Sequence, residues 1–489
     1  MAKRLITKEA FLTAMECTTQ GWYLMRDKGG TPTPGEQLRM EEGKEVHRRA
    51  QSLHQNGVYA GKVERTKQLI LDSAIEVIFE AAFEVDGYAA RADWIRRTHS
   101  GWIIGEIKSS LHDDDGPKDE HIDDLAYTCM ILRRSGLPVK SCELVLMSRD
   151  WRLGMDDPSL FIVTDITEMV VERADEFNQT WERTGPLLLR NARPSPHWCF
   201  ACRNCDYFED QCIGVGVRDP IFVLPRLRES KFVELRSRGV FTIQGIPTDF
   251  KLSENQAAVA QAIRTREPLI DQELIRSSLD ELEWPVGYLD FETVKTAIPL
   301  YPGVAPHEQV VTQYSLHVEA SPGGELMHQE YLADHSTDCR EELASRLIHD
   351  TEGCRAIVVY SSFEKTTIRG LAKLRSAMAT DLANLEAKLF DLEPVVRKGL
   401  VHPDFGGRSS IKVVLPVLAP DLSYANLDIG DGSLAVAAFA RLASDSTSDN
   451  ETQAVRSALL AYCKMDTQAM VRGLQTLREL ATSRHDREG

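Results

Sequence analysis

Apolar and polar residues follow strand or helix spacing in several parts of the chain. Residues 88–110 (YAARADWIRRTHSGWIIGEIKSS) predict two strands joined by a turn at Thr98–Gly101. Residues 251–267 repeat apolar side chains at close to helical spacing and predict a helix, as do residues 459–474. A short apolar run at 287–293 predicts a buried strand. This mixture of strand and helix patterns favours an α/β protein.

The same patterns divide the chain into three regions. Residues 1–215 mix helical and strand patterns, residues 216–283 are mostly helical, and residues 284–489 open with a strand and end in a long helix. The 489 residues suffice for roughly two to four domains, each with its own core. Since no low-complexity linker or internal repeat separates the regions, we expect packed joints between them.

The composition restricts the cellular compartment and the binding partners that we expect for this protein. No apolar run approaches the roughly 18 residues that span a bilayer, and the start, MAKRLITKEAF, lacks an apolar signal core. We therefore expect a cytoplasmic protein without a membrane partner, in which the ten cysteines serve metal binding rather than a disulfide framework. The net charge of -17 argues against nonspecific coating of nucleic acid, but it does not exclude an enzyme with a local basic groove. The sequence lacks a P-loop, so unwinding would need a separate helicase or ATPase partner.

Three charged residues on the predicted hairpin form the first candidate site. Glu106 and Lys108 are two apart, so their side chains leave the strand on one face, and Asp93 lies on the partner strand. Two carboxylates can hold Mg²⁺ or Mn²⁺, while the lysine steadies water or phosphate. The alternative is an exposed hairpin with a surface ion pair. The apolar surroundings in IIGEIK favour a functional site, because a charge in an apolar strand is costly unless it has a partner.

Two further segments extend this site. Gly43 and His47 lie four apart in EEGKEVHRRA, and another predicted helix begins at DDLAYTCMIL. The order G-x3-H, D…ExK and a helix with Tyr127 resembles the RecB family of nucleases, including its CRISPR-associated members. The resemblance implies a PD-(D/E)xK, restriction-endonuclease-like domain in which His47, Asp93 and Glu106 bind metal and Lys108 is catalytic. The family's helix carries a glutamine where this sequence has Asp124, which puts the role of that helix in doubt.

Four of the ten cysteines lie within fourteen residues, in PHWCFACRNCDYFEDQCIG, and Cys17 lies far upstream. The local four, Cys199, Cys202, Cys205 and Cys212, would suit a zinc site. The RecB-like nucleases of the AddB and CRISPR-associated type instead hold a 4Fe–4S cluster with one early and three late cysteines. That resemblance implies Cys17 as the early ligand, Cys205 and Cys212 as two of the late ones, and either Cys199 or Cys202 as the third.

A second group of acids lies in the last region. Asp290 and Glu292 end the strand GYLDFET two residues apart, and Glu364 follows a second apolar strand at the head of a helix. Tyr462 and Asp466 lie four apart on one face of the predicted C-terminal helix. Like charges about 4 Å apart repel by roughly 4 kcal/mol at an effective dielectric of 20, so such acids need cations or raised pKa values. A DxE pair by itself is often structural or accidental.

In this order the acids resemble those of the DnaQ-like exonucleases of the RNase H-like fold, in the DEDDy subgroup with Tyr-x3-Asp in the last motif. The resemblance implies that the four acids hold two Mg²⁺ or Mn²⁺ ions and that Tyr462 orients the attacking water. Glu364 stands where the family usually has aspartate, and Asp391 is a spare acid that could join the site. The whole chain is similar to bacterial proteins that join these two domains.

These observations lead to one hypothesis and its rivals. The chain is interpreted as a two-nuclease protein with a RecB-like domain (1–215), a helical connector (216–283) and a DnaQ-like 3′–5′ exonuclease domain (284–489). We expect metal-dependent hydrolysis of DNA, rather than RNA, at single-stranded ends, in repair or defence. The alternatives are an RNA exonuclease, or a nucleic-acid-binding subunit in which one or both sites have decayed. Asp124 and Glu364 are the residues that favour decay.

Overall fold

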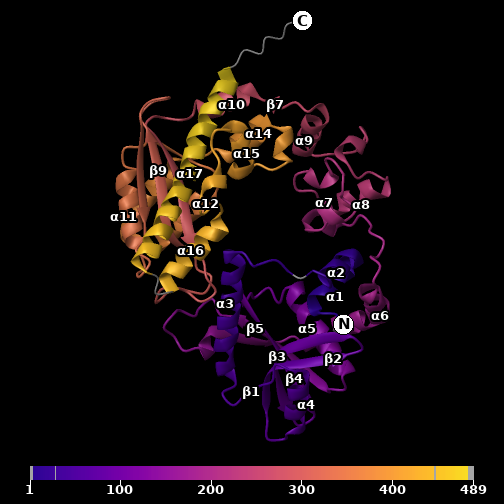
Figure 1. The fold of residues 1–489 in the computed structure, drawn as a ribbon. Coiled ribbons are helices and arrows are strands. Elements are labelled where there is room, and N and C mark those ends of the chain that lie inside the picture. Colours follow the sequence, from indigo (N-terminus) through magenta and orange to yellow (C-terminus); the bar gives the residue numbers. More distant parts are fainter. Residues whose placement is uncertain (1–3, 28, 445–447, 483–489) are drawn as a thin grey trace. The chain divides into compact units, whose positions relative to one another are not determined.

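The computed structural model describes residues 4–27, 29–444 and 448–482. The chain forms two compact units. The first contains Met1–Val215 together with Thr296–Glu308, and the second contains Gly216–Lys295 together with Gln309–Gly489. The largely helical region expected at 216–283 is part of the second unit. Figure 1 follows the chain through both units in colour.

The described strands of the first unit form one sheet in the order β1-β2-β3-β4-β5-β6. β2, β3 and β4 are an antiparallel meander, β5 runs parallel to β4 after a helical crossover, and β6 returns antiparallel to β5. The predicted hairpin is confirmed, with its strands ending at Thr98 and beginning at Gly101. The strands are β1 (Val58–Tyr59), β2 (Val77–Val85), β3 (Tyr88–Thr98), β4 (Gly101–Leu111), β5 (Val139–Met147) and β6 (Phe161–Asp165).

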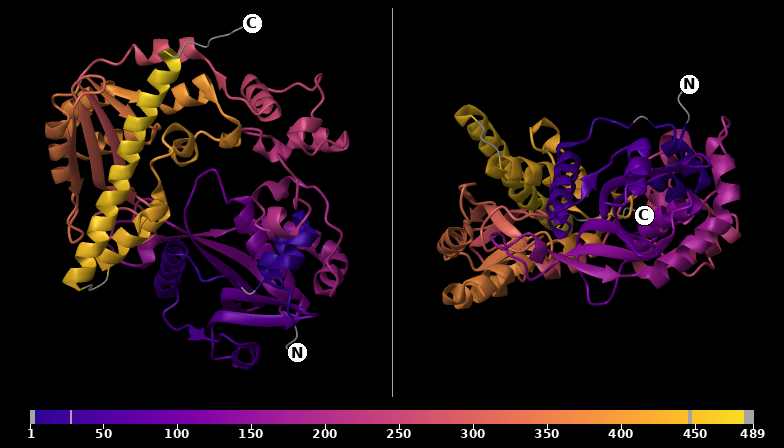
Figure 2. Two further views of the ribbon diagram at one scale, coloured as in Figure 1. Left: turned by 45° about the horizontal axis from the view of Figure 1, so that its top comes forward. Right: turned by 90° about the horizontal axis from the view of Figure 1, so that it is seen from below.

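Helices cover this sheet (Figure 2). The helix between β4 and β5, α5, is the most deeply buried because its middle is almost entirely apolar. Its Tyr127 hydroxyl lies 2.9 Å from the carbonyl oxygen of Ile6 and 3.0 Å from that of Ala89, so this tyrosine fastens the N-terminal segment to β3. The helices are α1 (Lys8–Glu16), α2 (Thr18–Leu24), α3 (Pro34–Ala50), α4 (Val63–Leu71), α5 (Asp119–Arg134), α6 (Thr167–Leu189) and α7 (Phe208–Gln211).

The main sheet of the second unit has the strand order β10-β9-β8-β11-β12 among the described residues. β9 is antiparallel to both β8 and β10, whereas β11 and β12 run parallel to β8. A separate pair joins β7 to β13. The strands are β7 (Leu269–Ile270), β8 (Val286–Val294), β9 (Val310–Glu319), β10 (Leu326–Leu332), β11 (Ala356–Val359), β12 (Leu389–Asp391) and β13 (Leu400–Val401).

The long C-terminal helix α17 packs on β8 and β9, and its apolar residues close a core with α10, α14 and α15. The helices predicted at 251–267 and 459–474 are confirmed as α9 and as part of α17. The helices of this unit are α8 (Glu229–Ser237), α9 (Glu254–Thr265), α10 (Gln272–Leu279), α11 (Arg340–Asp350), α12 (Phe363–Leu374), α13 (Ala379–Ala387), α14 (Glu393–Gly399), α15 (Ile411–Leu418), α16 (Gly432–Ser444) and α17 (Asp449–Thr482).

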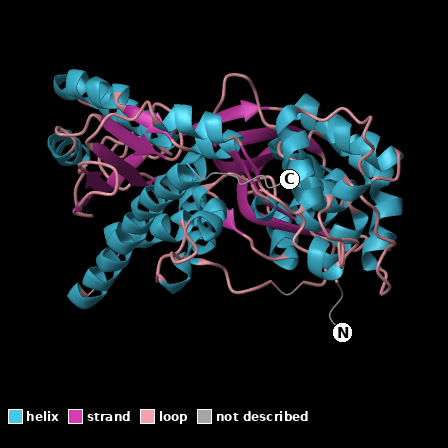
Figure 3. Cartoon of the chain, turned by 90° about the horizontal axis from the view of Figure 1, so that it is seen from above, coloured by secondary structure: helices cyan, strands magenta, loops and turns pink. Residues whose placement is uncertain are grey.

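Both units therefore combine sheets with flanking helices (Figure 3), and the predicted α/β class is confirmed. Within the ranges that the structure describes, none of the helices is long and apolar enough to cross a membrane.

Candidate metal and catalytic sites

The hairpin of the first unit brings Asp93 and Glu106 opposite each other. The adjoining pair, Trp94 and Gly105, is in register, so the next residues on either strand face one another. Asp93 Oδ2 accepts a hydrogen bond of 2.6 Å from the backbone N–H of Ile107. His47, on α3, places its Nδ1 atom 3.7 Å from Asp93 Oδ1. Of the three predicted metal ligands of this unit, the structure thus brings His47 next to Asp93, and it places Glu106 opposite Asp93 on the neighbouring strand.

Two lysines and two carboxylates alternate beside this site. Lys8 and Lys108 both donate to Glu106 Oε1, at 2.7 and 2.9 Å. Lys108 also donates to Asp124 Oδ2, and the Lys8 ammonium lies 3.4 Å from the same oxygen. Asp124, at the position of the family's glutamine, therefore holds the predicted catalytic lysine. Sequence analysis missed Lys8, because a lysine at the start of a first helix carries no motif.

The other oxygen of Glu106, Oε2, is buried and has no hydrogen-bond partner among the described residues. A buried carboxylate oxygen without a partner is costly. Direct coordination of a cation would satisfy it, so the donor atoms present here fit a divalent metal ion.

Glu80 on β2 also belongs to this site, although sequence analysis missed it. Ligand atoms of His47, Glu80 and Asp93 all lie within 4.8 Å of one another. The hairpin of β2 and β3, which precedes the predicted hairpin in the chain, contained a signal that could have identified Glu80. Glu80 and Asp93 are equally distant from its Asp86–Gly87 turn, and directly opposed residues of a hairpin share one face.

The charges of the site perturb one another. Burial and the charge of Glu106 raise the pKa of Asp93 to about 7. Burial opposes ionisation of Glu106, but the two lysines lower its pKa overall. Burial likewise disfavours the charged form of His47, while hydrogen bonding to Glu80 and the charge of Asp93 outweigh it and raise the pKa of the imidazole. Without a cation, therefore, burial and the charge of Glu106 favour the protonated form of Asp93, and the neighbouring carboxylates favour the protonated form of His47.

The five predicted cysteines converge in the first unit. Cys17 lies between α1 and α2, and Cys199 and Cys202 place their sulfur atoms 3.6 Å apart. Cys17, Cys202, Cys205 and Cys212 line a common cavity, with Tyr23 and His197 among the other residues of its wall. Four thiols around one space are the donor set of a 4Fe–4S cluster or of Zn²⁺. Cys199 is not among the residues that line this cavity, although hydrogen bonding to Cys199, followed by burial, raises the pKa of Cys17.

In the second unit, Asp290, Glu292 and Asp466 form a cluster. Asp290 and Glu292 project from one face of β8, and Asp466 meets them from α17, which packs on that strand. One oxygen of each carboxylate lies within 4.8 Å of the others. Three carboxylates at this separation are the hard oxygen donor set that suits Mg²⁺ or Mn²⁺. The predicted grouping of these acids is therefore present in the structure.

Residues around this cluster orient its members. Lys412 donates a hydrogen bond of 2.8 Å to the hydroxyl of Tyr462, and Tyr424 donates one of 2.5 Å to Asp466 Oδ1. The thiol of Cys463 points at Asp290 Oδ2 from 3.6 Å. Tyr424 and Cys463 escaped sequence analysis, because nothing in their spacing links them to the acids.

Glu364 stands in the first turn of α12 and is 3% exposed. Its Oε2 atom lies 3.2 Å from the hydroxyl of Ser361, and its charge acts on Asp290. Glu364 is not one of the three acids that meet within 4.8 Å. The spare acid Asp391 accepts a hydrogen bond from the N–H of Glu393 and so caps the start of α14.

The acids of the second unit resist ionisation together. Burial and the charge of Asp466 raise the pKa of Asp290. The same two causes raise the pKa of Glu292 to about 8. Burial raises the pKa of Glu364 to about 7 and that of Asp466 to about 6. The full negative charge of the cluster is thus unfavourable at neutral pH unless a cation is bound.

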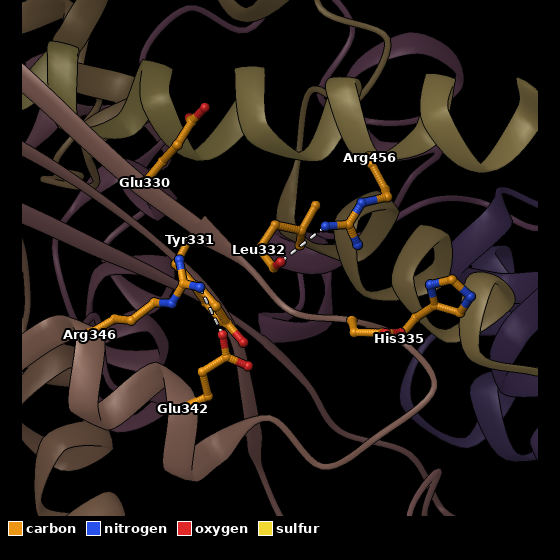
Figure 4. A pocket seen from close by; sticks show the side chains of 8 residues that line it. Glu330, Tyr331, Leu332, His335, Glu342, Arg346 and Arg456 are labelled. Carbon is orange, nitrogen blue, oxygen red and sulfur yellow. Dashed lines mark hydrogen bonds and ion pairs between the residues drawn. The ribbon is translucent and has the colours of Figure 1, made fainter. Parts of the chain in front are cut away.

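A cavity of about 470 Å³ lies elsewhere in the second unit (Figure 4). The end of β10, α11 and α17 supply its lining: Glu330, Tyr331, Leu332, Asp334, His335, Glu342, Arg346 and Arg456. Arg456 donates to the carbonyl oxygens of Leu332 and Ala333, and Arg346 pairs with Glu342 at 2.9 Å. These arginines brace the strand end and the helix, and the three clustered acids do not line the cavity.

Comparison with known proteins adds a family without an assigned activity. Residues 287–410 match the model of a family described as a domain of unknown function, DUF2779. This match includes Asp290, Glu292 and Glu364 but ends before the acids of α17. The chain is also similar to an uncharacterized protein of Mycoplasma genitalium, MG366, with 26% identity over 215 residues. That similarity covers 40% of this chain and 32% of the relative's length.

Proposed function

We propose that the protein is a metal-dependent nuclease with one site in each unit, acting on DNA. The observation that carries the proposal is the cluster of Asp290, Glu292 and Asp466, three carboxylates from two elements within 4.8 Å. Such a cluster is unfavourable in a folded protein without cations. Paired carboxylates that bind divalent ions are the usual means of hydrolysing phosphodiesters.

The topology of each unit supports this proposal. The strand order of the second unit is β10-β9-β8-β11-β12, and β9, the second of these strands along the chain, runs antiparallel to the other four. This arrangement is the one expected of an RNase H-like fold. In the first unit, the succession α3, β2, β3, β4, α5, β5 is the one expected of a PD-(D/E)xK domain. We infer fold identity from these orders, and activity from the side chains they carry.

In the second unit, divalent ions held by Asp290, Glu292 and Asp466 would activate water and offset charge on the phosphate. Lys412 is an ammonium and can only donate, so the Tyr462 hydroxyl is its acceptor. The tyrosine's own proton is then free to orient the attacking water. Tyr424 occupies Asp466 Oδ1 and leaves the other oxygen of this carboxylate to bind metal.

In the first unit, an ion held by His47 and Asp93 would supply the same Lewis-acid chemistry. Lys108 lies between Glu106 and Asp124 and is the group placed to stabilise negative charge on the phosphate. Burial opposes its charge, but the charges of Glu106 and then Asp124 raise its pKa, so it remains an ammonium during the reaction.

The cysteines have a structural role in this proposal. Cys17, Cys202, Cys205 and Cys212 would bind a 4Fe–4S cluster, with Zn²⁺ as the alternative. Such a cluster would join the start of the unit to its end across nearly 200 residues of chain, which lowers the entropy of the unfolded state. An absorbance band near 400 nm that bleaches with reductant would identify iron–sulfur, and a colourless protein with stoichiometric zinc would identify the alternative.

The test separates the two sites. End-labelled single-stranded DNA and RNA of matched sequence are incubated with Mn²⁺ and the parent protein, Lys108→Ala, Asp290→Ala or the double variant. Each single variant should retain cleavage by the other unit, and the double variant should retain none. Absence of cleavage of both nucleic acids by the parent with Mn²⁺ or Mg²⁺ would exclude the nuclease proposal.

A nucleic-acid-binding role without catalysis is the second candidate. The contact between Lys108 and Asp124 favours it, because an acid holds the lysine that would meet the phosphate. In that case DNA would bind tightly without divalent ions, and neither Lys108→Ala nor Asp290→Ala would alter the outcome of the assay.

A further inference from the structure

Glu80 occupies an unusual position in the sheet of the first unit. On β2 and β3, Phe79 pairs with Trp94 and Ala81 pairs with Ala92, so Glu80 and Asp93 occupy the opposed position between these pairs, at which the ladder itself is interrupted. The backbone of Glu80 has φ of 50°, a left-handed conformation that residues with a side chain rarely adopt. The strand is therefore distorted at the residue of β2 that lies opposite Asp93.

Three potential ligand atoms meet beside this distortion. His47 Nδ1 lies 4.0 Å from Glu80 Oε1 and 3.7 Å from Asp93 Oδ1. The side chain of Glu80 is 24% exposed, and Arg91 approaches its other oxygen at 3.5 Å. The three ligand atoms lie on three different elements, α3, β2 and β3. These atoms are close enough together to coordinate one divalent ion.

An independent observation points to a ligand in the same place. Glu106, directly across from Asp93, is 3% exposed, and its Oε2 atom has no hydrogen-bond partner in the described parts of the chain. Its Oε1 atom is already engaged by Lys8 and Lys108. Glu106 can thus offer one further oxygen to an ion, but it is not needed to bring the other three groups together.

We propose that Glu80 is a protein ligand of a divalent cation held with His47 and Asp93, and that this site prefers a transition-metal ion such as Mn²⁺ to Mg²⁺. The imidazole nitrogen favours transition-metal ions, whereas Mg²⁺ favours oxygen donors and retains its water. The cluster of the second unit consists of carboxylates and offers no such preference. The inference deepens the proposed nuclease function of the first unit and rests on it for the use of the ion.

Metal binding can be measured without activity. The full chain carrying Asp290→Asn, which weakens the cluster of the second unit, is titrated with Mn²⁺ and followed by electron paramagnetic resonance. Adding Glu80→Gln should weaken the tightest Mn²⁺ binding by at least about tenfold, the scale expected when the ligand environment of a metal is disrupted. The matched control is Glu84→Gln, an exposed glutamate on the same strand, which should leave the titration unchanged.

A second variant guards against loss of the fold. Glu80→Gly suits the left-handed backbone and removes the carboxylate, so it should keep the parent's thermal unfolding temperature in EDTA and still lose Mn²⁺ affinity. Mn²⁺ binding equal to the parent's in both Glu80 variants would overturn the assignment. Complete displacement of this Mn²⁺ by a roughly tenfold excess of Mg²⁺ would overturn the metal preference.

The outcomes separate this inference from the function on which it rests. Weakened Mn²⁺ binding in the Glu80 variants, together with a parent that cleaves no nucleic acid, would refute the nuclease function and leave the metal site standing. Cleavage that depends on Lys108, together with unchanged Mn²⁺ binding in Glu80→Gln, would refute the metal site and leave the function standing.

Discussion

Glu292→Gln should make the metal-free protein more stable at pH 8, although it removes a candidate metal ligand. Glu292 lies within 4.8 Å of Asp290 and Asp466, and burial and the charge of Asp466 raise its pKa from 4.5 to about 8. Because the folded protein holds this proton more tightly than the unfolded chain does, the contribution of Glu292 to the free energy of unfolding is highest below pH 4.5. It then falls as the pH rises towards 8. Glutamine remains neutral and should remove this part of the decline.

The size of the effect follows from the pKa of Glu292. The difference between 4.5 and 8, at about 1.4 kcal/mol for each pKa unit, corresponds to about 5 kcal/mol as an upper limit. Solvent screening and the neighbouring acids reduce it, and we expect roughly 2 kcal/mol or more. At about 2 °C for each kcal/mol in a unit of this size, the midpoint of unfolding at pH 8 should rise by roughly 4–10 °C.

The assay is thermal unfolding of the metal-free full chain, followed by intrinsic fluorescence between pH 5 and 8.5. Glu325→Gln, at an exposed turn of the same unit, is the matched control and should follow the parent. Mg²⁺ should raise the parent's midpoint more at pH 8 than at pH 5, and this difference between the two pH values should be smaller in Glu292→Gln. A pH profile of Glu292→Gln that coincides with the parent's would refute the reasoning.

Three further changes test individual side chains. Lys412→Met removes the donor to Tyr462, the tyrosine proposed to orient water. It should lower kcat of the second unit on the order of 10- to 100-fold with little change in KM, measured in a Lys108→Ala background. An unchanged kcat would remove the lysine from the proposed mechanism. Asp124→Gln releases Lys108 from an acidic partner and should speed cleavage by the first unit. Cleavage is measured in an Asp290→Ala background, which silences the second site. Slower cleavage would mean that the carboxylate of Asp124 is needed. Cys202→Ser should abolish binding of the proposed cluster or zinc ion, whereas Cys199→Ser should retain it, as measured by absorbance and elemental analysis. The reverse result would make Cys199 the ligand in place of Cys202.

Features set by local sequence were predictable, and features set by distant contacts were not. The hairpin around Asp93 and Glu106 and the strand that carries Asp290 follow from residue spacing, and the structure contains both. Lys8 and Tyr424 could not be found in this way. Lys8 reaches Glu106 across 98 positions of sequence, and Tyr424 reaches Asp466 across 42, so packing alone defines their roles.

Glu80 represents an intermediate case. The symmetry of its hairpin places it opposite Asp93, but the left-handed backbone of the folded strand and the approach of its carboxylate to His47 cannot be read from the spacing of residues. Hairpin symmetry is therefore a signal that can be searched in other sequences with a D…ExK pattern.

The segment Thr296–Glu308 limits how the two units can be separated by cutting the chain. It leaves β8 and returns to β9, yet its backbone bonds to the first unit, with Ala297 donating to Glu42 and residues 303 and 304 pairing with Leu153. A fragment that ends at residue 215 would leave the partly buried carboxylate of Glu42 without this donor and expose the apolar residues that the segment covers. Each unit therefore consists of two stretches of chain, and the stretches of the two units alternate along the sequence. No single cut of the chain separates one complete unit from the other, so point substitutions are the way to silence one site at a time.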